Sequence, residues 1–195
     1  MDTLLTASNL TVARGDRTLL SAFRLVVVSG DAVHLRGRNG AGKTSLLEVL
    51  AGVRRPAAGE VTSAGPTQIH WLGHRNALHI DLTASENLDY WCALHHVDPK
   101  GIPAALERVG LDKVRRRPVR TYSAGQKRRA ALARLFLVRR PLWLLDEPLS
   151  GLDAHGVALF GATLAEHIGT GGAAVVTSHQ ALPGRLPRVT TIELA

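Results

Sequence analysis

The sequence predicts an α/β fold in which a mainly parallel sheet is covered by helices, with a small helical subdomain beside it. Three observations predict it. Short apolar runs alternate with helical segments, a glycine-rich loop joins a predicted strand to a predicted helix, and the stretch from about 84 to 137 reads as purely helical. We expect one domain over 1–195, with 1–83 and 138–195 forming the core and about 84–137 the helical subdomain.

The individual elements follow from apolar periodicity and from turn residues. Thr83 to Glu86 and Ser123 to Gln126 have the spacing of capping boxes, which predicts a helix after each. Gly52 is placed to end the helix before it. The expected order is β-rich segments at 4–12 and 18–28, a strand at 32–35, a helix at 43–50, a strand at 69–72, helices at about 84–95, 102–109 and 124–138, a strand at 142–145, a helix at about 154–168, and strands at 173–177 and 188–192.

Composition predicts a globular cytosolic chain. Its 195 residues are 45% hydrophobic with a mean hydropathy of +0.04, and no apolar run approaches the length of a bilayer span. The first residues show no basic and apolar secretory pattern. A single cysteine, Cys92, excludes an internal disulfide and suits a reducing compartment.

The net charge of +8 has three possible explanations: a nucleic acid partner, an anionic membrane surface, or merely a basic proteome. Aromatic residues are only 4% of the chain, which disfavours a stacking platform for single strands. We therefore expect a solvated basic face and no nucleic acid partner. The excess is concentrated in Arg115-Arg116-Arg117, Arg120, Lys127-Arg128-Arg129 and Arg139-Arg140.

A phosphate-binding loop is the clearest local motif. Glycine, four residues, then Gly-Lys-Thr stands between a predicted strand and a predicted helix. The glycines let backbone N–H groups point at phosphate oxygens, and the helix N-terminus favours negative charge. Lys43 supplies a charge for the β- and γ-phosphates and Thr44 a hydroxyl for Mg²⁺. The expected ATP-binding residues here are Gly37, Arg38, Asn39, Gly40, Ala41, Gly42, Lys43, Thr44 and Ser45.

Two acids end the apolar run at 142–145. Asp146 and Glu147 stand at the carboxyl end of a strand, where open α/β sheets place their ligand crevice. Asp146 is expected to hold Mg²⁺ through water. Glu147 is expected to polarise the attacking water as general base.

These motifs, taken in order, resemble the ATP-binding subunits of ABC transporters, a family of P-loop NTPases. Tyr122-Ser123-Ala124-Gly125-Gln126 is similar to the family signature, Leu144 to Glu147 to its Walker B strand, Ser150-Gly151-Leu152-Asp153 to its D-loop, and Ser178-His179 to its switch histidine. The resemblance covers nearly the whole chain. It implies an ABC-type nucleotide-binding domain with an antiparallel β subdomain beside the parallel core.

The resemblance also implies that the chain works as a head-to-tail dimer with ATP between the two copies. Ser123, Gly125 and Gln126 of one copy would contact the γ-phosphate held by Lys43 of the other. His179 would brace that phosphate, and Asp153 would couple the two sites. Hydrolysis would then drive membrane subunits between two orientations.

Two positions depart from the family pattern. Where the family often has an aromatic residue to stack on adenine, this chain has Arg14, whose planar guanidinium can also stack. Where the family has a glutamine after the strand at 69–72, this chain has His74. A protonated imidazole there would repel Mg²⁺, so we expect activity to fall at mildly acidic pH.

Within the family, the chain resembles the ATP-binding subunit of the heme exporter of bacterial cytochrome c maturation. The resemblance rests on Trp71 to Ala77, Leu82 to Leu88, Tyr90-Trp91, Pro141 to Leu145 and Ser178-His179-Gln180. It implies a peripheral ATPase on the cytoplasmic face of the inner membrane, docked on small integral membrane subunits. Whether heme is pumped or a heme-carrying chaperone is released stays open. No direct heme binding is expected, since His95-His96 lacks a Cys-x-x-Cys-His context.

Two other functions remain as alternatives. One is an ABC ATPase that serves another small substrate. The other is a soluble ABC ATPase acting on ribosomes or DNA, which the chain disfavours because it has no room for a second ATPase domain or a long coiled coil. A GTPase is disfavoured because no Asn-Lys-x-Asp motif occurs.

Overall fold

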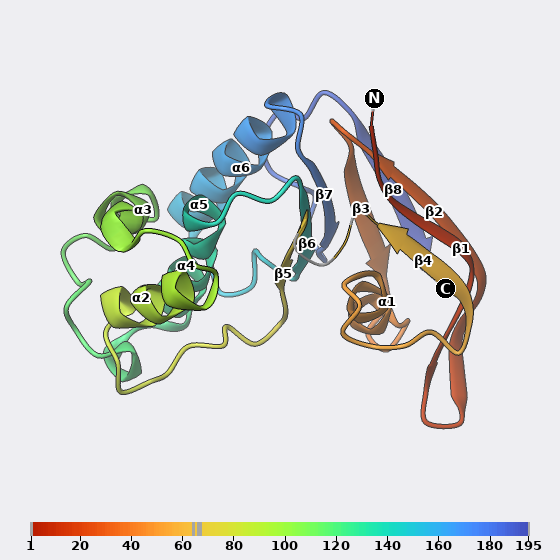
Figure 1. Cartoon of the computed structure of the whole chain (residues 1–195), viewed down its shortest axis with the longest axis horizontal. Helices are drawn as coiled ribbons and strands as arrows, with labels where there is room; N and C mark the ends of the chain where they lie inside the picture. The colour runs from red at the N-terminus through yellow and green to blue at the C-terminus, as the bar shows by residue number, and fades with distance from the viewer. Residues whose placement is uncertain (1, 64, 66–67, 195) are drawn as a thin grey trace. The chain divides into compact units, whose positions relative to one another are not determined.

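The computed structural model describes residues 2–63, 65 and 68–194. The chain divides into two compact units. We call Met1–His74, Arg140–Pro148 and Gly161–Ala195 the core unit, and Arg75–Arg139 with Leu149–Phe160 the helical unit. Figure 1 shows the elements of both. The helical unit is more extensive than the predicted 84–137, since it also takes in 75–83, 138–139 and 149–160.

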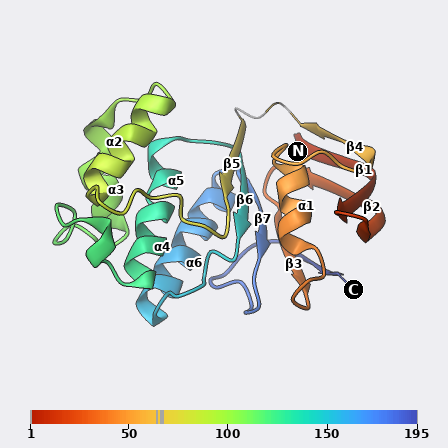
Figure 2. The same cartoon turned by 90° about the horizontal axis from the view of Figure 1, so that it is seen from below.

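The core unit is built on a five-stranded parallel sheet in the order β5-β6-β7-β3-β8. β6 and β7 are buried at every residue, as expected of central strands in a sheet covered on both faces. β5, β6 and β7 lie side by side in Figure 2. The bounds are β3 Ala32–Gly37, β5 Ile69–Leu72, β6 Leu142–Asp146, β7 Ala173–Thr177 and β8 Val189–Leu194.

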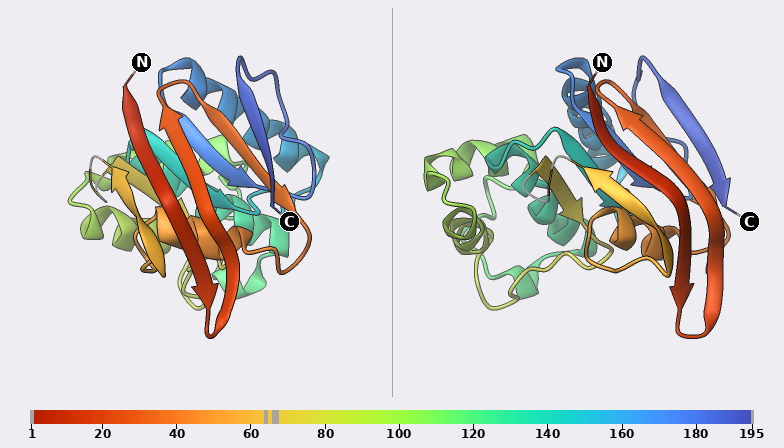
Figure 3. Two further views of the ribbon diagram at one scale, coloured as in Figure 1. Left: turned by 90° about the vertical axis from the view of Figure 1, so that its right-hand side faces the viewer. Right: turned by 45° about the vertical axis from the view of Figure 1, so that its right-hand side comes forward.

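A three-stranded antiparallel sheet, in the order β2-β1-β4, completes the strands of the core unit. Its strands are β1 Thr3–Arg14, β2 Arg17–Val28 and β4 Ala58–Ser63. Figure 3 shows β4, β1 and β2 side by side, with β1 and β2 forming a long hairpin. β1 and β2 lie where β-rich segments were predicted, whereas β4 was not predicted.

One apolar core joins the two sheets. The helix α1, Lys43–Leu50, buries Leu46, Leu47 and Val49 in a cluster with the inner faces of both sheets. On the other face of the parallel sheet, Trp143 of β6 stacks on His167 of α6, with ring centroids 3.7 Å apart. The helix α6 spans Ala154–Gly169, of which 161–169 belong to the core unit. The phosphate-binding loop, which links β3 to α1, is therefore anchored at both ends in this core.

The helical unit has its own core. Leu88, Leu106, Leu111 and Ala130 are fully buried in a single cluster of helical residues. Both predicted capping boxes are formed, by Thr83 with Glu86 and by Ser123 with Gln126. The elements are α2 Ala84–Leu94, the 3₁₀ helix η2 Pro99–Gly101, α3 Ile102–Arg108, the 3₁₀ helix η3 Val119–Thr121, α4 Ala124–Leu132 and α5 Arg134–Leu137.

The prediction of one continuous helix from 124 to about 138 was wrong. The helix is interrupted at Ala133, which separates α4 from α5. Arg134, the first residue of α5, donates to the backbone carbonyls of Asn76 and Ala77 and lies over the ring of Trp91. These tertiary contacts of a buried guanidinium accompany the break, where local propensity alone favours a continuous helix.

Candidate functional site

The glycine-rich loop has the backbone that only glycine adopts freely. Gly42 has a φ of +94°, and a Cβ at this position would lie 3.0 Å from Cβ of Leu19. At Gly37, φ is +143° and a Cβ would lie 2.5 Å from the carbonyl oxygen of Leu194. Side chains are thus excluded by geometry and by space at both positions, which keeps the loop backbone open to a ligand.

Lys43 curls back over this loop. Its Nζ donates to the carbonyl oxygens of Gly37 at 2.7 Å and Arg38 at 3.1 Å, and the residue is only 8% exposed. The ammonium group is therefore held over the loop that precedes α1. Together with the free N–H groups of the helix N-terminus, this arrangement is suited to binding phosphate.

Asp146 is the centre of a hydrogen-bond network. Its Oδ2 accepts from Thr44 Oγ1 at 2.9 Å, and its Oδ1 accepts from Thr177 Oγ1 at 2.7 Å. The side chain is oriented by hydroxyls from α1 and β7, and the residue is 1% exposed. A carboxylate beside a hydroxyl is the hard oxygen donor set that Mg²⁺ prefers, so Thr44 and Asp146 fit the metal that a nucleotide triphosphate carries.

Glu147 follows in a strained conformation. Its φ of +47° is unusual for a residue with a side chain, and its N–H donates to Thr177 Oγ1 at 2.9 Å. Its Oε1 lies 3.5 Å from Nε2 of His179. Strain of this kind persists where surrounding contacts impose it, most often at functional sites. Here the strained backbone places the carboxylate of Glu147 close to the imidazole of His179.

Most of the predicted residues of the core unit line one hollow of about 470 Å³. This volume is in the usual range for a small-molecule site. It brings His74 and Arg14 together with the phosphate loop and with both acids, and it adds Arg17 and Leu19, which were not predicted. The lining residues are Arg14, Arg17, Leu19, Asn39, Gly40, Gly42, Lys43, Thr44, Ser45, His74, Asp146, Glu147 and His179.

Three predicted loop residues lie elsewhere. Arg38 and Ala41 line a second hollow of about 350 Å³, which shares Asn39 and Gly40 with the first. Gly37 is packed under the carbonyl of Leu194 and lines neither hollow. The loop is thus accessible from two sides.

The signature residues lie in the helical unit and form a helix start. Ser123 Oγ accepts from Gln126 N–H at 3.2 Å, and Gln126 Oε1 accepts from Ser123 N–H at 2.9 Å. A Cβ on Gly125 would lie 2.6 Å from the carbonyl oxygen of Gly151, so the turn after β6 requires glycine here. The exposed N-terminus of α4 is consistent with a contact to an anion.

Asp153 caps the next helix of the same unit. Its Oδ1 accepts from the N–H of Gly156 at 2.8 Å, at the start of α6. That hydrogen bond lowers the pKa of the carboxyl, with smaller contributions from Arg129 and His155. Asp153 is therefore a charged, fixed and exposed side chain.

Sequence reasoning missed two residues that support this site. Thr177 is fully buried and contacts both acids. His34 is 4% exposed in β3, and its Nε2 lies 3.1 Å from the carbonyl oxygen of Ser178, the residue before His179. A carbonyl only accepts, so Nε2–H donates, and burial lowers the pKa of the imidazole. The available signals were a hydroxyl at the end of the otherwise apolar strand β7 and an imidazole within the apolar part of β3.

Comparisons with known proteins agree with this geometry. The family model described as ABC transporter matches residues 20–150. A protein of Rhodopseudomonas palustris (strain BisB5) named cytochrome c biogenesis ATP-binding export protein CcmA is 42% identical over 91% of this chain and 92% of its own. A CcmA of Pseudomonas savastanoi pv. phaseolicola is 45% identical over 94% of this chain and 91% of its own.

Solved structures share the fold. A putative ABC transporter ATP-binding protein from Pyrococcus furiosus superposes with a TM-score of 0.83 at 23% identity, over 96% of each chain. None of the helices among the described residues combines the length and apolar character needed to cross a bilayer. On the strength of the family match and of the relatives, this chain belongs to the ATP-binding subunits of ABC transporters.

Proposed function

We propose that the chain is the ATP-hydrolysing subunit of an ABC transporter that powers heme export or heme delivery for c-type cytochrome biogenesis. The names of its relatives support the process, and the hollow around the phosphate loop supports the chemistry. One observation carries the chemical part. Asp146 and Glu147, at the carboxyl end of β6, share a hollow with Lys43 and Thr44 at the start of α1.

In this proposal the loop binds the phosphates of ATP. Backbone N–H groups of the loop and the ammonium of Lys43 take the β- and γ-phosphates. Thr44 and Asp146 would hold Mg²⁺, Asp146 through water, and the ion would neutralise charge on the phosphates. Thr177 keeps Asp146 in place through its 2.7 Å hydrogen bond.

Glu147 is the proposed general base. Its carboxylate would orient the attacking water and take a proton from it as the γ-phosphate leaves ADP. His179, 3.5 Å from that carboxylate, would donate to the γ-phosphate. His74 lines the same hollow and would contact the attacking water or the metal.

We further propose that a second copy completes the site. Ser123, Gly125 and Gln126 would reach the γ-phosphate bound by the other copy, and Asp153 would link the two sites. The exposed start of α4, with its satisfied capping box, supports this role. The chain would lie on the cytoplasmic face of the inner membrane, and small integral membrane subunits would receive the resulting movement.

Gene deletion tests the proposed process. A deletion strain should lack covalent heme on c-type cytochromes, and a plasmid copy of the wild type should restore it. A Lys43→Ala copy expressed to the same level should fail to restore it, because the phosphates lose their cation. Normal cytochromes in the deletion strain would contradict the cytochrome c assignment, and transport of another small substrate would then be favoured.

A further inference from the structure

Two arginines stand directly opposite each other at the turn between β1 and β2. Arg14, the last residue of β1, pairs in register with Arg17, the first residue of β2. Gly15, with a φ of +58°, lets the chain reverse within the two residues between them. Like charges opposite each other on an antiparallel pair of strands are destabilising. The hairpin does not require arginine at both positions, so the pair lowers stability without a benefit to the fold.

Neither arginine is neutralised in the part of the chain that the structure describes. The ion pairs found there join other residues, and both Arg14 and Arg17 are exposed. Two adjacent guanidinium groups without a carboxylate are ready for a ligand that carries negative charge or a π-face.

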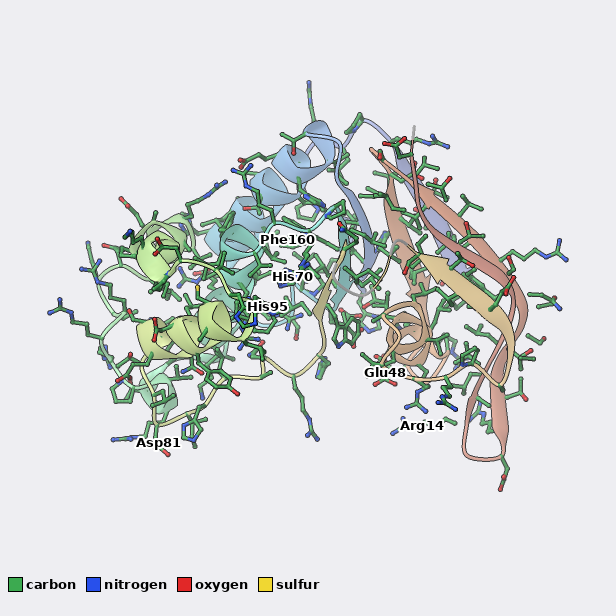
Figure 4. All side chains as sticks on the ribbon, viewed as in Figure 1. Arg14, Glu48, His70, Asp81, His95 and Phe160 are labelled. Atoms are coloured by element: carbon green, nitrogen blue, oxygen red, sulfur yellow. The ribbon has the colours of Figure 1, made fainter. Side chains whose placement is uncertain are left out.

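The arginines face the nucleotide site. Both line the hollow that contains Lys43 and Thr44. Leu19, two residues after Arg17, packs so closely on Gly42 that a Cβ there would be 3.0 Å away. The hairpin is thereby fixed against the phosphate loop within the core unit. Figure 4 shows Arg14 extending from the hairpin on the side where α1 lies.

The residues of the hollow divide between the two ends of a nucleotide. The loop, Lys43, Thr44 and the two acids account for the phosphates and the metal. Ser45 follows the loop on α1, and His74 and His179 belong to the proposed hydrolysis site. The hairpin contributes the other three lining residues, Arg14, Arg17 and Leu19. The described lining contains no Phe, Tyr or Trp, and its one amide, Asn39, belongs to the phosphate loop. With both histidines assigned to the hydrolysis site, we assign the base to the hairpin, whose lining residues include no aromatic side chain.

We propose that Arg14 and Arg17 form a guanidinium clamp on the purine base, and that the site consequently accepts GTP about as well as ATP. A guanidinium plane stacks on the π-face, which every base presents, and it reads little of the edge that distinguishes adenine from guanine. The negative face of the base also relieves the repulsion between the two arginines. This inference rests on the nucleotide site of the proposed function.

Competition against a fluorescent ATP analogue tests the clamp, with ATP, GTP and inorganic tripolyphosphate as competitors. ATP and GTP should differ by no more than about threefold in Kd, because stacking is tolerant of the base. Arg14→Ala and Arg17→Ala should each weaken both nucleotides by about 2- to 30-fold, the range for a cation–π contact. Tripolyphosphate, which has no base, should bind these variants as it binds the wild type.

Matched variants separate stacking from charge and from folding. Arg14→Tyr should keep nucleotide affinity, whereas Arg14→Lys should lose it because an ammonium has no plane. Arg24→Ala removes an exposed charge of the same strand that does not line the hollow, and should have no effect. Circular dichroism confirms that each variant is folded, and glutamine replaces alanine wherever it is not.

Three results would overturn the clamp. The first is a wild-type preference for ATP over GTP of more than about 20-fold, and the second is unchanged nucleotide affinity in both arginine variants. The third is that the arginine variants lose as much affinity for tripolyphosphate as for the nucleotides, which would assign the arginines to phosphate. Failure of the nucleotide site itself looks different. In that case Lys43→Ala would bind every competitor as the wild type does.

Discussion

Thr177 donates a 2.7 Å hydrogen bond to Oδ1 of Asp146 and, with the same hydroxyl oxygen, accepts the N–H of Glu147 at 2.9 Å. One fully buried side chain at the end of β7 thus fixes both acids at the end of β6. Glu147 has a strained backbone, with a φ of +47°, and its N–H is held by this second bond. A neighbouring strand, rather than the acids' own strand, sets the geometry of the proposed metal ligand and base.

Replacing Thr177 should therefore damage catalysis more than folding. Thr177→Val keeps the branched shape but loses the hydroxyl, and ATP turnover should fall by about 10- to 100-fold, as for other groups that orient a metal ligand. Thr177→Ser should retain most of the rate because it keeps the oxygen. Steady-state phosphate release measures both, and a Thr177→Val enzyme at wild-type rate would show that the network is dispensable.

His34 should act through His179. Its Nε2–H bonds the carbonyl of Ser178, so His34→Val frees the segment that carries His179. Loss of one such bond is about 1 kcal/mol, and kcat should fall by about 3- to 10-fold with unchanged affinity for ATP. His34→Gln offers a donor amide and should recover part of the rate. A loss confined to ATP affinity, with kcat intact, would contradict this positioning role.

Stability should fall as the solution becomes acidic. Burial lowers the pKa of His34 and of His167 below the ordinary value of 6.5, so the unfolded chain binds protons that the folded chain does not. Their contribution is complete above about pH 7 and is lost as the pH falls through 6.5 toward the folded values. Urea unfolding at several pH values should show this slope, and His34→Val should reduce it. A slope that is identical in His34→Val would remove His34 from the explanation.

Arg134 should stabilise the helical unit. Burial lowers its pKa to about 10, and its guanidinium satisfies the carbonyls of Asn76 and Ala77. Arg134→Met would leave both carbonyls without this donor, and the free energy of unfolding should drop by about 2–4 kcal/mol. The exposed neighbour Arg139→Ala is the control and should change stability by less than about 0.5 kcal/mol. Equal stabilities of the two variants would show that the buried contacts contribute nothing.

Most elements could be predicted because the signal for each lies within a few consecutive residues. The capping boxes at Thr83 and Ser123 are self-contained, and α1 has the predicted bounds Lys43–Leu50. β4 escaped prediction because its residues Ala58, Gly59 and Glu60 are exposed and weak strand formers. It is a strand only because β1, far away in the sequence, offers it an edge.

The residues of the candidate site likewise differ in whether a local sequence pattern could predict them. Lys43, Asp146 and Glu147 lie in contiguous motifs, so their types and spacing indicated the chemistry. Thr177 and His34 contribute through partners 31 and 144 residues away, a separation that no local pattern encodes. The pairing of Arg14 with Arg17 needed the register of a hairpin. Long-range packing, not local propensity, supplies these supporting contacts.

In the proposed function, Glu147 is the base of an ATPase completed by a second copy. The most direct test of this proposal is single-turnover hydrolysis and size-exclusion chromatography of Glu147→Gln with ATP. We expect ATP binding at wild-type affinity, a loss of about 10²- to 10⁴-fold in rate, and a dimer that persists while ATP is bound. Hydrolysis near the wild-type rate would show that Glu147 is not the base, and a monomer at saturating ATP would contradict the shared site.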